Sequence, residues 1–485
     1  MANPPPKIRR AAFIALTLLA LAVRLPQLGE RPMHTDEAVN AFITGKILTG
    51  EKYRYDPGDR HGPALYLLAA PVAKICGAKN LSDLTETELR LTPAIVGSAT
   101  VLLFGAAAEI FGFIPCLIAA LLFAIGPLPV YYGRYFIHET LFVAATFGLI
   151  LSGWQTVKKN SVPHAALAGL CAALMLACKE TAVIHFFALG CAALCIRPLA
   201  REKLPALKTV ATALLVFGVA TILLFTWFGQ NWSALADLLR AVPNFAARAG
   251  GQGHEKPFTY YFAILDPLFL FFIVAAAGIY AVICDAVAGV RRTGLALAIY
   301  AAVIFLIYSF IPYKTPWLAL NFWLPTSLLC GLGVEGVWRQ IHNATGRWIT
   351  GLAVGALVLM TAEQTKTLAF DHPADERNPL AYAHTTEDVL GLPARIGEIC
   401  RERKINEPTI AVVAKDAWPL PWYLRKFSRV GYWQPNQNPG DADFFITPTD
   451  LDGTLAGQLK DFRPEFFGVR PNVLLILWVP PAPQP

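Results

Sequence analysis

Long apolar runs separated by short polar clusters fill the first three quarters of the chain. A helix that crosses a membrane needs about 20 mostly apolar residues, and fewer where neighbouring helices support it. Eleven runs meet or approach this length, whereas a further run over 63–75 could cross the membrane or lie flat at its surface. The eleven runs are 11–28, 92–110, 115–131, 140–157, 164–178, 182–196, 209–229, 262–284, 295–312, 317–335 and 348–362.

Basic residues between the runs indicate which loops face the cytoplasm, because Lys and Arg are enriched on that side of a membrane. They form five clusters: Lys7, Arg9 and Arg10; Lys158 and Lys159; Arg197, Arg201, Lys203 and Lys208; Arg291 and Arg292; Arg339 and Arg347. An even number of crossings must separate one cluster from the next, which requires that 63–75 does not cross. We therefore expect eleven spans, with 63–75 as a juxtamembrane helix on the outer face.

Two other stretches need an interpretation of their own. Residues 164–196 are too long for one span at about 1.5 Å per residue, and Lys179 and Glu180 lie near the middle of this stretch. We expect two short helices there, joined by an outer turn. Residues 11–28 resemble a signal peptide, but no small-residue cleavage site follows them, so we expect a retained first helix.

The chain changes character after residue 362, where acidic and basic residues alternate and short runs of β-type residues appear beside a helical pattern. These elements are expected at 409–414, 443–447 and 473–479 for strands and at 392–403 for a helix. We expect a membrane domain over 1–362 with an outer-face loop at 29–91, then a small extracytoplasmic α/β domain over 363–485. This tail has no Gly-rich phosphate loop, CxxC pair or HExxH motif, so its sequence assigns it no chemistry.

Composition supports a membrane protein and removes other classes. Of the 485 residues, 55% are hydrophobic and only 15% are charged, whereas a soluble chain carries about a quarter charged residues. The net charge of +7 comes from clusters between apolar runs, so topology explains it better than nucleic-acid binding does. Most of the nine cysteines lie in apolar runs, which argues against a disulfide scaffold. The expected fold is a polytopic α-helical protein of a plasma or bacterial inner membrane.

Unusual polar residues gather in the loops that this topology places on the outer face. Ionisable residues at a membrane surface that do not belong to a cytoplasmic cluster are candidates for function. They are His34, Asp36, Glu37, His61, Arg134, His138, Glu139, Lys179, Glu180 and Lys314, with Tyr313 beside the last.

Structural explanations compete with functional ones at several of these positions. Asp36 could open a helix over 36–48 as a solvated N-cap. Lys314 is more specific, because it lies in a turn between Pro312 and Pro316, which is more than an interfacial anchor requires.

Two other pairs also have structural explanations. Arg134 and Glu139 could anchor the chain at the interface beside neighbouring tyrosines. Lys179 and Glu180 could form a turn that pairs with itself. The sequence alone leaves both alternatives open.

The order of these motifs resembles that of the C-type (GT-C) membrane glycosyltransferases. An acidic pair, Asp36-Glu37, is followed by the segment His61-Gly62-Pro63-Ala64-Leu65-Tyr66, then by Arg134-Tyr135-Phe136-Ile137-His138-Glu139, and then by Lys179-Glu180. The protein O-mannosyltransferase and aminoarabinose-transferase families carry similar elements in this order. The likeness is good over residues 1–200 and weaker beyond them.

Other features make the resemblance narrower and also limit it. The HxDE start, the Tyr313–Trp317 turn and the Trp418–Tyr423 tract are similar to the prokaryotic family of flippase-activity-associated membrane proteins. The chain departs from the wider group at His61-Gly62-Pro63, where the second Pro position differs, and at Glu139, where many relatives have Asp.

The resemblance implies inverting transfer of a sugar from a polyprenyl-phosphate carrier to a lipid, glycan or protein acceptor on the outer face. Asp36 would act as general base, with Glu37 as its orienter or as an alternative base. Glu139 would hold Arg134 or bind sugar hydroxyls. The donor phosphate would be held by Arg134, Lys179, Lys314 and His61, and the substrates would also contact His34, His138 and Tyr313.

Two alternatives remain. Several of these histidines and carboxylates could hold a divalent metal, but their spacing is scattered, so we expect no metal or other cofactor. The protein could also be a flippase or transporter of lipid-linked sugars. Transporters usually place ionisable residues near the bilayer midplane and show repeated halves, and neither feature is evident in this sequence.

The topology can be tested directly. Reporter fusions after Lys79 and Lys158 should report the outer and inner face, respectively, because four crossings separate the first two basic clusters. An inner-face signal at Lys79 would contradict this topology and would separate the Asp36-Glu37 pair from Glu139 across the membrane.

Overall fold

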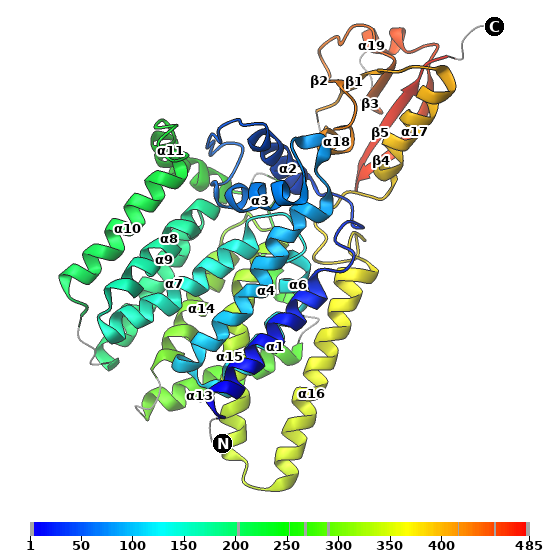
Figure 1. The fold of residues 1–485 in the computed structure, drawn as a ribbon. Helices are drawn as coiled ribbons and strands as arrows, with labels where there is room; N and C mark the ends of the chain where they lie inside the picture. Colours follow the sequence, from blue (N-terminus) through cyan, green and yellow to red (C-terminus); the bar gives the residue numbers. More distant parts are fainter. Residues whose placement is uncertain are drawn as a thin grey trace. The chain divides into compact units, whose positions relative to one another are not determined.

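Apolar helices and one small sheet make up the protein in a computed structural model, which describes residues 4–200, 204–251, 253–265, 269–288, 292–415, 417–450 and 453–481. The chain separates into two compact units (Figure 1). The bundle unit comprises residues 1–28, 52–69 and 90–372. The sheet unit comprises 29–51, 70–89 and 373–485. Each unit is described by itself below.

Each of the predicted apolar runs coincides with helical structure. The helices are α1 Pro6–Arg24, α3 Ala64–Cys76, α4 Glu86–Phe111, α5 Phe113–Ile125, α6 Pro127–Tyr132, α7 Glu139–Lys159, α8 Val162–Cys178, α9 Ala182–Ala200, α10 Leu207–Phe225, α11 Ala234–Ala249, α12 Tyr260–Leu265, α13 Phe269–Val287, α14 Thr293–Phe310, η3 Pro316–Ala319, α15 Leu320–Gln340, α16 Ala344–Lys366 and the π-helical turn η4 Thr367–Asp371. Among the described residues, six helices are long and apolar enough to cross a membrane, and others are shorter. The predicted fold class is confirmed, whereas the number of crossings stays a prediction.

The helices of the bundle unit run alternately up and down, because short connections join them. In Figure 1 the N-terminus and the connection between α15 and α16 lie at the same, lower end of the bundle. The cluster Lys158–Lys159 ends α7 at this lower end, as expected for topogenic residues. The loops of this unit that carry candidate residues lie at its opposite end (Figure 1). Three members of the predicted clusters, Arg201, Lys203 and Arg291, fall outside the described residues.

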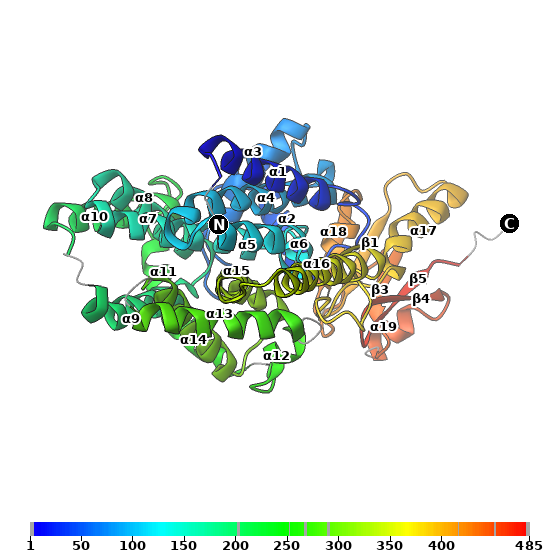
Figure 2. The ribbon, with the colours of Figure 1, turned by 90° about the horizontal axis from the view of Figure 1, so that it is seen from below.

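Helix α15 forms the centre of the bundle, since nearly all of its residues from Leu320 to Gly333 are buried, whereas α10 and α16 are largely exposed (Figure 2). Small residues let the helices approach closely. A Cβ atom at Gly331 would lie 2.2 Å from the carbonyl oxygen of Pro115 in α5, and one at Gly278 would overlap Leu329. Any larger side chain at these two glycines would force the helices apart.

A buried arginine supports the break between α5 and α6, where Pro127 interrupts the helix. The carbonyl oxygens at such a break have no partner within the helix. Arg24, at the end of α1, donates hydrogen bonds to the carbonyls of Phe123, Ala124 and Pro129 at 2.9–3.1 Å. This charged residue therefore has a structural task inside the bundle.

The sheet unit contains a five-stranded sheet with the strand order β2-β1-β3-β5-β4. Its elements are α2 Thr35–Leu48, η1 Leu81–Asp83, α17 Asp388–Arg403, β1 Thr409–Val413, α18 Leu420–Tyr423, β2 Arg429–Trp433, β3 Phe444–Pro448, α19 Gly453–Gln458, β4 Arg463–Arg470 and β5 Val473–Val479. The first three strands of that order are parallel, and the last two are antiparallel to their neighbours. The predicted C-terminal α/β domain is confirmed.

Two strands of this sheet have no clear signal in the sequence. β2 and β4 lie at the edges of the sheet and expose many of their side chains, so they carry polar and basic residues and Pro464. The three predicted strands are β1, β3 and β5, which are mostly buried and therefore mostly apolar.

Candidate active site

The candidate residues are divided between the two units. The bundle unit carries His61, Arg134, His138, Glu139, Lys179, Glu180, Tyr313 and Lys314. The sheet unit carries His34, Asp36 and Glu37.

Lys179 and Glu139 form a buried ion pair at one end of the bundle. Lys179 follows α8, and its ammonium group donates a hydrogen bond to the carboxylate of Glu139, the first residue of α7. Burial alone would lower the pKa of Lys179, but the Glu139 carboxylate outweighs this effect and raises it, so the lysine stays charged. Among the described residues Glu139 pairs with Lys179. The expectation that Glu139 holds Arg134 is therefore wrong.

Glu180 has other partners than Lys179. The expectation that Lys179 and Glu180 pair with each other in a turn is therefore also wrong. Its Oε2 atom lies 2.8 Å from Nδ1 of His61, and its Oε1 accepts a hydrogen bond of 2.6 Å from the hydroxyl of Tyr55. Burial would raise the pKa of Glu180, but the charge and hydrogen bond of His61 and the bond from Tyr55 lower it to about 2. The carboxylate is therefore ionised at every physiological pH.

His61 keeps one ring nitrogen for another partner. Glu180 occupies its Nδ1, whereas its Nε2 is not buried and bonds to none of the described residues. A carboxylate that accepts a hydrogen bond from one ring nitrogen orients the imidazole. His61 is thus an oriented imidazole that can donate a hydrogen bond to an anion.

His138 is buried beside His61, with ring centroids 5.5 Å apart. Burial lowers the pKa of His138 well below its ordinary value, and His61 and Lys179 lower it further. The neutral ring lies with Nε2 3.2 Å from the carbonyl oxygen of Gly62. A Cβ atom at Gly62 would lie 2.3 Å from the carbonyl oxygen of Ala177, so this position requires glycine.

Arg134 lies close to the end of the first helix. Its Nη2 donates a hydrogen bond of 3.2 Å to the carbonyl of Gln27, and its guanidinium group stacks 4.1 Å from the ring centroid of Phe370. The neighbouring Tyr135 stacks on Trp317 of the later turn, with ring centroids 6.5 Å apart. The Arg134 loop and the Tyr313–Trp317 turn are therefore neighbours within the bundle unit.

Lys314 holds two loops together. Its ammonium donates hydrogen bonds to the carbonyls of Ile311 at 2.6 Å and Lys256 at 3.0 Å, and it makes no ion pair with the described carboxylates. Burial lowers the pKa of Lys314. The ring of Tyr313 packs at a tilt against that of His254, with centroids 4.8 Å apart, and Tyr313 lies near enough to Lys179 to help raise the pKa of that lysine. The bundle unit therefore brings together the turn at Tyr313 and the turn at Lys179.

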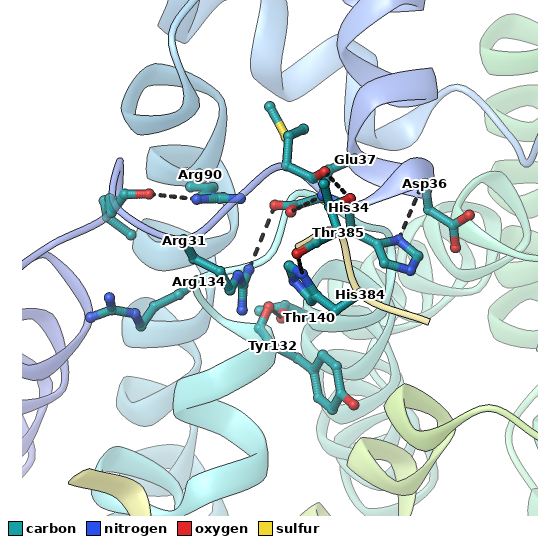
Figure 3. Close-up of polar contacts among 12 residues, drawn as sticks. Arg31, His34, Asp36, Glu37, Arg90, Tyr132, Arg134, Thr140, His384 and Thr385 are labelled. Carbon is teal, nitrogen blue, oxygen red and sulfur yellow. Dashed lines mark hydrogen bonds and ion pairs between the residues drawn. The ribbon is translucent and has the colours of Figure 1, made fainter. Parts of the chain in front are cut away.

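The acidic pair lies in the first turn of α2 in the sheet unit, where His34 rather than Asp36 is the N-cap (Figure 3). His34 Nδ1 accepts the Asp36 backbone N–H at 3.0 Å, and Glu37 accepts the His34 N–H at 3.2 Å. Glu37 is fully buried and lies 3.7 Å from Arg31. The half-buried Asp36 carboxylate, in contrast, makes no hydrogen bond or ion pair with the described residues.

Several partners of the candidate residues have no signal in the sequence. Arg31 pairs with Glu37, and the ring of His384 lies 5.6 Å from that of His34 (Figure 3). Tyr55 binds Glu180. His384 comes from the far end of the chain, so only the folded structure could identify it. Among the described residues no three His, Cys, Asp or Glu side chains gather as a metal site, and independence of metal stays a prediction.

Comparisons with known proteins address the fold. Residues 60–223 match the model of the family described as dolichyl-phosphate-mannose-protein mannosyltransferase. ArnT from Cupriavidus metallidurans, bound to undecaprenyl phosphate, superimposes with a TM-score of 0.68 at 13% identity over 97% of this chain and 99% of that chain. The fold is that of the GT-C membrane glycosyltransferases.

Other solved structures agree. The oligosaccharyltransferase of Archaeoglobus fulgidus in its apo form has a TM-score of 0.64 at 12% identity, over 95% of this chain and 74% of that chain. The arabinofuranosyltransferase AftD from Mycobacteria has a TM-score of 0.52 at 15% identity, over 99% of this chain and 40% of that chain. No curated protein sequence matches significantly. The resemblance to the GT-C group is confirmed, whereas the narrower likeness to flippase-associated proteins stays a prediction.

Replacement of Glu180 by Gln should destabilise the protein in a pH-dependent way. The folded-state pKa of about 2 lies below the ordinary 4.5, so this carboxylate stabilises the fold above about pH 4.5 and loses that effect as the pH falls towards 2. The shift corresponds to about 3 kcal/mol. Thermal unfolding in detergent should show a difference between wild type and Glu180→Gln at pH 7 that shrinks below pH 4.5.

The exposed carboxylate of Asp59 provides a control. The Asp59→Asn variant removes a surface partner of Arg60 and should change stability by less than about 1 kcal/mol at any pH. A Glu180→Gln variant as stable as wild type at pH 7 would contradict the structural role of the pair with His61.

Proposed function

We propose that the protein is a glycosyltransferase that moves a sugar from a polyprenyl-phosphate carrier to an acceptor on the extracytoplasmic face. One observation carries the proposal: the fold agrees over nearly the full length of both chains with ArnT, which was solved with undecaprenyl phosphate bound. The concentration of ionisable side chains in the loops at one end of the bundle supports it. The acceptor is a lipid, a glycan or a protein.

Asp36 is the proposed general base. An inverting transfer needs a carboxylate that takes the proton of the acceptor hydroxyl as the new glycosidic bond forms. Glu37 is less suited to this task, because its carboxylate caps α2 and pairs with Arg31. The carboxylate of Asp36 has neither duty and lies on the first turn of the same rigid helix.

The departing carrier phosphate requires cations that are already in place, because negative charge develops on it as the bond to the sugar breaks. His61 supports this role, since its Nε2 is open while Glu180 fixes the ring. Lys179 stays charged beside Glu139. We assign the phosphate to His61, Lys179, Lys314 and Arg134, and contacts to the sugar or acceptor to His34, His138, Tyr313 and Glu139.

A flippase would need phosphate-binding residues in a different arrangement. A flippase must recognise the carrier phosphate from both sides of the membrane in turn. The candidate cations of the bundle unit lie in loops at one end of the helices, and the other end carries the basic clusters that topology explains. This distribution favours an enzyme.

The assay uses purified protein in detergent with a polyprenyl-phosphate sugar and candidate acceptors. Wild type should release free polyprenyl phosphate. The Asp36→Asn variant should slow release by at least about 100-fold with unchanged binding of the carrier, because an amide cannot accept the proton. The matched control is Glu51→Gln, which changes an exposed carboxylate just beyond the same helix and should leave the rate unchanged.

Two results would count against the proposal. Full transfer activity in Asp36→Asn would remove Asp36 as the base and direct attention to Glu37. Movement of labelled carrier across liposomes, without cleavage of the sugar–phosphate bond for any acceptor, would replace the transferase with a flippase.

A further inference from the structure

Side chains of the C-terminal domain bind both backbone polar groups of Met33, shortly before the acidic pair. The backbone N–H of Met33 donates a hydrogen bond of 2.7 Å to the hydroxyl of Tyr423. The hydroxyl of Thr385 donates a hydrogen bond, also 2.7 Å, to the carbonyl of Met33 (Figure 3). Met33 and Thr385 are at most 1% exposed. Both backbone polar groups of Met33 are thus bound by side chains more than 350 positions away.

The next residue links the same domain to Asp36. His34 Nδ1 accepts the N–H of Asp36, so the ring proton is on Nε2, which lies 3.1 Å from the carbonyl oxygen of Tyr382. Burial lowers the pKa of His34, which keeps the ring in this neutral form. The imidazole therefore connects the tail of the chain with the first turn of α2.

The tail segment that makes these contacts is itself fixed on the sheet. Thr386 donates its backbone N–H to the carbonyl of Val469 at 3.0 Å and its hydroxyl to the carbonyl of Gly468 at 2.6 Å, both in β4. Arg470, at the end of β4, lies 3.4 Å from the hydroxyl of Thr35. A continuous set of hydrogen bonds thus runs from the sheet to the helix turn that carries Asp36.

We propose that the C-terminal domain is a positioning clamp for Asp36, in which Tyr423 and Thr385 fix the backbone N–H and carbonyl of Met33 and thereby the first turn of α2. The inference deepens the proposed function and rests on it, because it assigns the clamp to the Asp36 base. A displacement of a catalytic group by about 1 Å can slow a reaction 100-fold. A general base at the start of a helix is therefore better placed when the backbone just before the helix is held. Thr385 and Tyr423 are positioning residues and need not touch substrate.

A neighbouring threonine separates positioning from simple stability. Thr386 makes the same kind of bond from its hydroxyl to a backbone carbonyl, but this carbonyl belongs to the sheet and not to Met33. The Thr386→Val and Thr385→Val variants remove equivalent bonds from adjacent residues. The Thr385→Ser variant retains the hydroxyl and serves as the conservative replacement.

The experiment measures amide hydrogen exchange over residues 31–38 and steady-state transfer kinetics in the full-length protein. Thr385→Val and Tyr423→Phe should speed exchange of this segment about fivefold, since each loses one buried hydrogen bond. They should also lower kcat about tenfold with an unchanged KM for the donor. Thr385→Ser should restore both values. Thr386→Val should change each value much less than Thr385→Val does, because the backbone N–H of Thr386 still binds the carbonyl of Val469.

Each other outcome counts against the clamp. Unchanged exchange in Thr385→Val and Tyr423→Phe would show that these bonds do not hold the loop. Faster exchange with an unchanged kcat, or an equal loss of kcat in Thr386→Val, would show that the bonds do not position the base. If wild type transfers no sugar, the proposed function fails. The exchange data still decide whether the domain holds the backbone of Met33.

Discussion

A charge buried at the end of an apolar bundle costs several kcal/mol unless a partner and further hydrogen bonds satisfy it, and the arrangement of the bundle unit follows from this constraint. Lys179 and Glu139 offset this cost by pairing with each other, and Glu180 offsets it through its contacts with His61 and Tyr55. Both solutions need side chains from separate loops. The turn between α8 and α9 must therefore pack against the start of α7 and against the loop over 53–62, which fixes these segments together.

The sheet unit solves the corresponding problem for the acidic pair. Glu37 can be buried because Arg31 and the backbone of His34 satisfy it, and this leaves the carboxylate of Asp36 without a structural duty. Two adjacent acids of the same type thus have different environments. The environment, rather than the residue type, separates the structural acid from the proposed chemical one.

The sequence predicts those features that depend on local pattern. Apolar runs predict the helices of the bundle, because a span must be apolar along its length. Buried strands such as β1 have an equally clear pattern, whereas the exposed edge strands β2 and β4 do not.

The sequence indicates the candidate residues but not the side chains with which they pair. The sequence indicates Arg134 as the cation for Glu139, whereas the packing of the turn after α8 against the start of α7 makes Lys179 its partner. Thr385 belongs to no motif, and the Trp418–Tyr423 tract gives no sign that Tyr423 binds the backbone of Met33, since both contacts join distant parts of the chain.

The central proposal is that Asp36, as the base, and the phosphate-binding cations of the bundle unit act in one sugar-transfer reaction. A polyprenyl-phosphate sugar analogue with a photoreactive group on the sugar tests it most directly. The account predicts labelling within residues 33–37 and also within 134–139 or 311–317, with both signals removed by unlabelled polyprenyl-phosphate sugar. Competable labelling of the bundle loops with none in 33–37 would contradict the claim.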